Sequence, residues 1–67
     1  NVLTAIGNSG DASLIEIAEG LLNDPSPLVR AMAVWALKRL APETVDTLPQ
    51  RARETDEAVL MEWASAP

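Results

Sequence analysis

The sequence of 67 residues contains no cysteine and no histidine, and its only aromatic residues are Trp35 and Trp63. Without cysteine the chain cannot form a disulfide, a thiolate metal site, a cysteine-ligated iron–sulfur cluster or a thiol nucleophile. Without histidine it also lacks the commonest metal ligand and the commonest general base near neutral pH. We therefore expect no catalytic residue, no cofactor-binding residue and no metal ligand in this chain, and no enzymatic activity of its own.

Positive charge and long apolar runs are also scarce. Five basic against ten acidic residues give a formal net charge of −5, which disfavours non-specific binding to nucleic acid. A local basic patch remains open, because recognition depends on the face that a protein presents. No apolar run approaches the roughly 20 residues of a membrane span, and no basic-then-apolar leader is present. We expect a soluble, cytoplasmic internal or C-terminal fragment of a longer protein, without a membrane partner.

A repeat of about thirty residues is the strongest internal pattern. After a shift of 31 positions, residues of similar size and polarity coincide, among them Ala5 with Ala36, Ile6 with Leu37, Ile17 with Leu48, Val29 with Leu60 and Ala33 with Ala64. A period of this length in a helical chain is typical of stacked helix pairs. Such a stack has two open ends, through which the chain could self-associate.

Helix start and stop signals divide the chain into five segments, and no strand period appears, so the predicted fold class is all-α. Asp11 and Ser26 are predicted N-caps, and Thr55-Asp56-Glu57 reads as a third capped start. Pro49 lies inside the weakest segment and should bend it. The predicted helices span residues 1–7 (incomplete), 12–23, 27–40, 43–53 and 56–66.

The predicted helix over 27–40 is apolar around much of its circumference, which indicates packing on more than one side. Trp35 lies among its apolar residues and is predicted to pack in the core or between repeats, whereas Trp63 in a truncated last helix is expected to be exposed. Gly20 costs up to about 1 kcal/mol relative to alanine within a helix, and we expect a neighbouring helix to come close there. Gly7 and Gly10 are interpreted as turn residues, because the strand, lysine and hydroxyl of a phosphate-binding loop are missing.

The segments 5–11 (AIGNSGD), 21–30 (LLNDPSPLVR) and 33–37 (AVWAL) carry a family resemblance. Together they are similar to the phycobilisome-lyase type of HEAT repeat, and the resemblance fades after Leu40. It implies a HEAT-like α-α superhelix of about two repeats with truncated terminal helices. The chain would then be a single repeat segment over residues 1–67.

Residues 1–10 (NVLTAIGNSG) and 27–37 (PLVRAMAVWAL) resemble, more narrowly, the C-terminal HEAT-like region of bacterial epoxyqueuosine reductases. The resemblance implies a parent oxidoreductase that acts in queuosine modification of transfer RNA (tRNA) with cobalamin and iron–sulfur clusters. In that family the catalytic and cluster-binding parts precede the repeats. This segment would then help to dock tRNA or pack against the neighbouring catalytic domain of the same chain.

Five basic residues are the candidate contacts for tRNA or a protein partner: Arg30, Lys38, Arg39, Arg51 and Arg53. Arg30 could instead close the repeat by pairing with Asp24 or with an acid of the adjoining repeat. The other four could form a small basic edge, or could be ordinary solvated helix ends that complement the helix dipole.

The acidic pairs Glu16 with Glu19 and Asp56 with Glu57 could in principle perform acid–base chemistry or hold a cation. Their expected positions, on a polar helix face and at a helix start, explain them without that chemistry. Two functions stay open. One is a non-catalytic segment of an epoxyqueuosine reductase, and the alternative is a generic HEAT-repeat scaffold for protein–protein interaction, as in lyase-like proteins.

Overall fold

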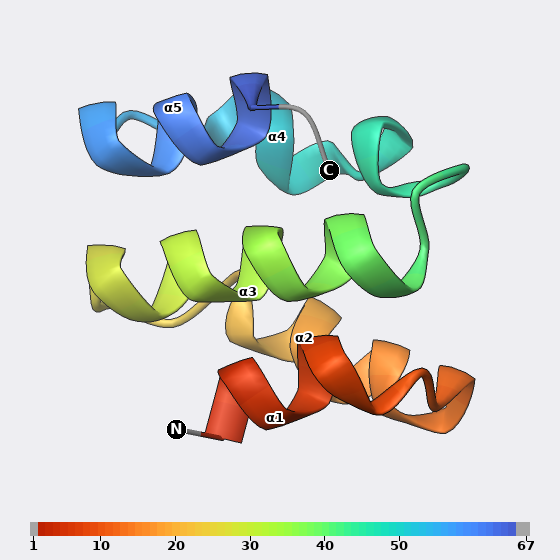
Figure 1. The fold of residues 1–67 in the computed structure, drawn as a ribbon. Coiled ribbons are helices and arrows are strands. Elements are labelled where there is room, and N and C mark those ends of the chain that lie inside the picture. Colours follow the sequence, from red (N-terminus) through yellow and green to blue (C-terminus); the bar gives the residue numbers. More distant parts are fainter. Residues whose placement is uncertain (1, 66–67) are drawn as a thin grey trace.

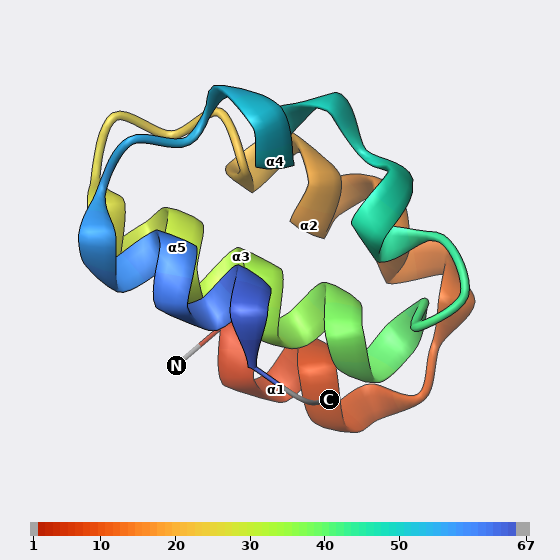
Figure 2. The same ribbon diagram turned by 90° about the horizontal axis from the view of Figure 1, so that it is seen from above.

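The computed structural model describes residues 2–65, which form helices arranged in two layers (Figures 1 and 2). Helices α1, α3 and α5 lie above one another in one layer and run in the same direction, while α2 and α4 return in the second layer. The all-α helical-repeat fold expected from the sequence is confirmed. In chain order the elements are α1 (Val2–Ser9), the 3-10 helix η1 (Ala12–Leu14), α2 (Ile15–Leu21), α3 (Pro27–Leu40), the 3-10 helix η2 (Val45–Thr47), α4 (Pro49–Arg53) and α5 (Glu57–Ala64).

Helix α3 is the centre of the stack, because it packs against α1, α2 and α5. Its buried residues therefore face more than one neighbour, as its apolar circumference predicted. The offset of 31 residues has a structural counterpart, since Ile6 in α1 and Leu37 in α3 are both buried in the core. The buried cluster consists of Leu3, Ile6, Ala18, Leu22, Ala33, Val34, Ala36, Leu37, Val45, Val59 and Trp63.

Side-chain caps begin three of the helical segments. The Asp11 carboxylate accepts a hydrogen bond from the Ser13 N–H at 2.9 Å, and the Ser26 hydroxyl accepts one from the Val29 N–H at 3.4 Å. The Asp56 carboxylate accepts from two N–H groups at the start of α5, at 2.9 and 3.2 Å. These bonds satisfy N–H groups that have no partner within a helix. The first of the capped segments opens as the 3-10 turn η1, before α2.

The continuous helix predicted over 43–53 does not form. Residues 45–47 make the 3-10 turn η2, Leu48 is extended (φ −71°, ψ 137°), and Pro49 is the first residue of the short helix α4. Proline sterically disfavours the helical conformation of the residue before it. Pro49 therefore separates two short helices instead of bending one.

The other predicted ranges differ less from the structure. Helix α3 covers the predicted range 27–40, and α1 extends to Ser9. The helix predicted over 12–23 is the 3-10 helix η1 followed by α2, which ends at Leu21, and the helix predicted over 56–66 is α5, which spans Glu57–Ala64. Residue 1 of the first predicted range and residue 66 of the last lie outside the described residues.

Two interpretations of the glycines were wrong. Gly7 is a buried residue within α1, and a Cβ atom built on it would lie 2.4 Å from the nearest ring atom of Trp35. The close approach predicted at Gly20 is absent, because a Cβ atom there would meet nothing within 4 Å. Gly10 does form a turn, with φ of +67°, a conformation that favours glycine.

Candidate interaction surfaces

Arg30 joins the start of α3 to the loop between α4 and α5. Its Nε donates to Glu54 Oε1 at 2.9 Å and its Nη2 donates to Glu54 Oε2 at 3.1 Å, while Nη1 donates to the backbone carbonyls of Asp24 (2.9 Å) and Pro25 (3.1 Å). The side chain of Arg30 is 19% exposed and that of Glu54 is 7% exposed. This geometry closes the repeat through an acid of the following helix pair and through carbonyls of the 23–26 turn.

The pair also changes the proton affinity of its members. The hydrogen bond from Arg30 lowers the pKa of Glu54 below its ordinary value of 4.5, and the backbone N–H groups of Asp56 and Thr55 lower it further. Hydrogen bonding to Glu54 raises the pKa of Arg30. Both shifts favour the charged forms, so the pair is an ion pair at neutral pH.

Lys38 is buried, with 6% of its surface exposed, and does not belong to an exposed basic edge. Its Nζ donates to the backbone carbonyls of Trp63 and Ser65 at the end of α5. Carbonyls in the last turn of a helix have no partner within that helix. Lys38 therefore supplies a cap to α5 from the neighbouring helix α3.

The remaining basic residues contact different elements. Arg39 donates from Nε to the Gly7 carbonyl at 3.3 Å, and its guanidinium carbon lies 5.2 Å from the centre of the Trp35 ring. Arg51 forms an exposed salt bridge with Asp46, with Nη1 and Oδ1 2.6 Å apart. Arg53 is exposed at the end of α4. The five predicted residues are thus not gathered into one basic surface.

Trp63 is 3% exposed, so its predicted exposure was wrong. It packs within the core cluster, and the guanidinium of Arg51 lies 6.0 Å from its ring centre. Trp35 is half-buried against Gly7, which agrees with the packing role predicted for it. Neither ring therefore forms an open stacking platform for a nucleobase.

The acidic pairs do not converge on a cation site. Asp56 caps α5, while Glu16 and Glu19 lie on α2. Among residues 2–65 no group of three or more potential ligands is placed to hold a metal ion. Within the same residues no helix has the length and apolar character needed to cross a membrane.

A polar hollow of about 330 Å³ lies beside the Arg30–Glu54 pair. The side-chain oxygen of Gln50 is buried there without a hydrogen-bond partner among the described residues. The hollow is lined by Leu22, Asn23, Arg30, Gln50, Arg53, Glu54 and Thr55.

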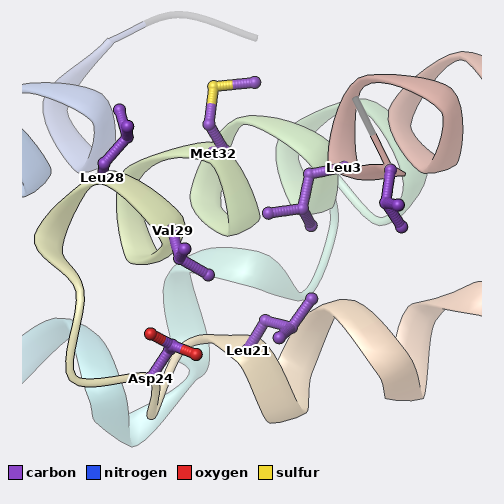
Figure 3. Close-up of a pocket in the computed structure, with 7 residues that line it drawn as sticks. Leu3, Leu21, Asp24, Leu28, Val29 and Met32 are labelled. Atoms are coloured by element: carbon purple, nitrogen blue, oxygen red, sulfur yellow. The ribbon is translucent and has the colours of Figure 1, made fainter.

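A second hollow, which we call the apolar groove, opens between the starts of α1 and α3 and the end of α2 (Figure 3). Its volume is about 450 Å³, and it is lined by Val2, Leu3, Leu21, Asp24, Leu28, Val29 and Met32. Val2 is 71% and Leu28 73% exposed, so the walls are accessible. Sequence reasoning missed this site, although the apolar circumference of the helix predicted over 27–40, which includes Leu28 and Met32, was a signal for it.

A family model described as HEAT repeats matches residues 1–66, which is nearly the whole chain. No curated protein and no solved structure matches the chain significantly. The family match agrees with the two-layered helix stack. It identifies the repeat fold and does not identify a parent enzyme.

Proposed function

The chain belongs to the HEAT-repeat family, and from this premise we propose that it is a helical-repeat scaffold segment that binds protein partners through exposed apolar side chains. The observation that carries the proposal is the apolar groove, with Val2 and Leu28 more than two-thirds exposed. Contiguous exposed apolar surface is typical of protein-binding sites. A second apolar area lies on α5, where Leu60 is 40% and Met61 71% exposed.

Most of the basic side chains form hydrogen bonds or salt bridges within the chain, and this supports a protein partner over a nucleic acid. Arg30 and Lys38 bond to groups of the chain itself, and Arg51 pairs with Asp46. These contacts leave little positive charge to neutralise phosphates in a chain whose net charge is −5. Since the sequence contains neither cysteine nor histidine, we assign to the segment binding alone, with no catalytic step and no cofactor.

Site-specific photo-crosslinking in the cell tests this proposal. A photoreactive amino acid replaces Leu28 or Met61, and a matched control places it at Asp46, an exposed polar position on η2. We expect adducts at Leu28 or Met61 that protease degrades and nuclease does not, with few at Asp46. Adducts that nuclease removes, or equal yields at all three positions, would contradict a protein-binding role.

A second candidate function is more specific: the segment would help an epoxyqueuosine reductase to dock tRNA. It rests on the resemblance of residues 1–10 and 27–37 and on the exposure of Arg39 and Arg53. Titration of labelled tRNA with the purified chain tests it. Saturable binding that Arg39→Ala and Arg53→Ala both weaken would favour this candidate, and the absence of binding at low salt would exclude tRNA docking by this chain.

A further inference from the structure

We propose that the apolar groove receives an amphipathic helix of a partner protein and that a lysine or arginine of this helix pairs with Asp24. This inference rests on the proposed protein-binding function and assigns the chemistry of the partner. It follows from the shape of the groove, the nature of its lining and the position of the single charged group in it.

The lining of the groove has the composition of a helix-binding site. Six of the seven lining residues are apolar, and they come from three helices: Val2 and Leu3 from α1, Leu21 from α2, and Leu28, Val29 and Met32 from α3. Figure 3 shows the side chains of Leu3, Leu21 and Val29, one from each helix, pointing toward one another. Grooves of this kind bind the apolar face of a helix, whose side chains at i, i+3, i+4 and i+7 enter them together.

Two side chains of α3, Leu28 and Met32, suit the binding of such side chains. Leu28 is 73% exposed at the start of α3, and the unbranched side chain of Met32 lies one helical turn further along. Methionine adapts to irregular apolar surfaces because it is unbranched and polarizable. Burying Leu28 under a partner would remove apolar surface from water, which favours association.

Among residues 2–65, Asp24 is the only charged residue that lines the groove. Its Oδ1 accepts a hydrogen bond of 2.9 Å from the Ser26 N–H, which fixes the carboxylate in place. Neither salt bridge among the described residues includes Asp24, because the carboxylate that pairs with Arg30 is that of Glu54. The charge of Asp24 helps to raise the pKa of Arg30, but Arg30 forms its salt bridge with Glu54, so Asp24 remains available for a salt bridge with a partner's cationic side chain in the groove. The net charge of −5 would also attract a basic segment.

Selection from a displayed library of random helical peptides tests the proposal on the full 67-residue chain. Selected peptides should combine apolar residues at helical spacing with a lysine or arginine beside them. Their affinities are then measured by fluorescence anisotropy against three variants. Leu28→Glu charges the groove, and Asp24→Asn removes its carboxylate and keeps an acceptor for Ser26. Ile17→Glu is the control, since Ile17 is an exposed apolar residue of α2 (52%) that lies outside both apolar areas.

We expect Leu28→Glu to weaken binding by about tenfold or more, and Asp24→Asn to weaken it by about three- to tenfold with a smaller salt dependence. Ile17→Glu should change the affinity by less than about twofold. Selected peptides that respond to Ile17→Glu and not to Leu28→Glu would overturn the groove assignment and leave the protein-binding function standing. Failure to select any peptide, together with photo-crosslinks to RNA alone, would overturn both.

Self-association gives a further outcome. If sedimentation shows a dimer that Leu28→Glu dissociates, the groove holds a second copy of the chain, and the assignment to a basic helix is overturned. An unchanged affinity in Asp24→Asn would also overturn the basic character of the partner.

Discussion

The guanidinium of Arg30 and the carboxylate of Glu54 meet through two parallel hydrogen bonds, 2.9 Å from Nε to Oε1 and 3.1 Å from Nη2 to Oε2. The two residues are 24 positions apart, so the pair ties the start of α3 to the loop that precedes α5. Bidentate pairing of this kind is both stronger and more specific in geometry than a single charged contact. It holds the second helix pair against the first.

A double-mutant cycle on this pair should reveal a larger coupling free energy than a cycle on the exposed pair Arg51–Asp46. The exposed pair, with side chains 44% and 59% exposed, should contribute about 0–1 kcal/mol. Urea unfolding of Arg30→Ala, Glu54→Ala and the double variant measures the first coupling, and the corresponding three variants of Arg51 and Asp46 provide the control. Equal couplings would show that Arg30–Glu54 behaves as an ordinary surface pair.

The pair also predicts how stability depends on pH. Because the pKa of Glu54 is lowered by folding, its contribution is complete above its ordinary pKa of 4.5 and is lost as the pH falls through the lower folded value. Glu54→Gln should flatten this acid-side loss in thermal unfolding curves between about pH 5 and 2. Glu16→Gln, on the exposed face of α2, controls for the change in net charge. If the melting temperature fell equally steeply with pH in wild type and in Glu54→Gln, the lowered pKa assigned to Glu54 would be contradicted.

Two glycines should respond in opposite ways to replacement by alanine. Gly7→Ala should destabilise by about 1–3 kcal/mol, because the new methyl group would overlap the ring of Trp35, 2.4 Å away. Gly20→Ala should stabilise by up to about 1 kcal/mol, since alanine has the higher helix propensity and meets no neighbour within 4 Å. Chemical denaturation of both variants measures the difference. Stabilisation by Gly7→Ala would contradict this prediction, because it would show that the Trp35 ring can move aside without a loss of stability.

Lys38→Met should loosen the end of α5. The substitution keeps a buried chain of similar length and removes the donors to the Trp63 and Ser65 carbonyls. Carbonyls left without a partner weaken the last turn by about 1–3 kcal/mol. Hydrogen exchange should accelerate in residues 62–65 more than in the middle of α3. A uniform acceleration would indicate general destabilisation instead.

The features that were predictable from the sequence are local ones. The serine–proline start of α3, the cap at Asp11 and the capped start of α5 depend on residues within one turn of each other. The break at Leu48 was also a local effect, because proline restricts the residue before it. It was missed because Pro49 was interpreted as a bend within one helix.

Other features depend on contacts between distant segments. The burial of Lys38 and Trp63 follows from the packing of α5 on α3, 25 residues away in the sequence, and periodicity within one helix cannot reveal it. The choice of Glu54 as the partner of Arg30 is of the same kind. The apolar groove was missed for this reason too, since it forms only where three helices meet.

The most direct test of the central claim is an affinity measurement on the molecule recovered by photo-crosslinking, made with two double variants of the chain. Leu28→Glu/Met61→Glu places charge on both apolar areas, whereas Arg39→Ala/Arg53→Ala removes two exposed basic groups. Binding through apolar surface predicts a loss of about tenfold or more in the first variant and less than about twofold in the second. A loss confined to the arginine variant would contradict a protein-binding scaffold and would indicate an anionic partner.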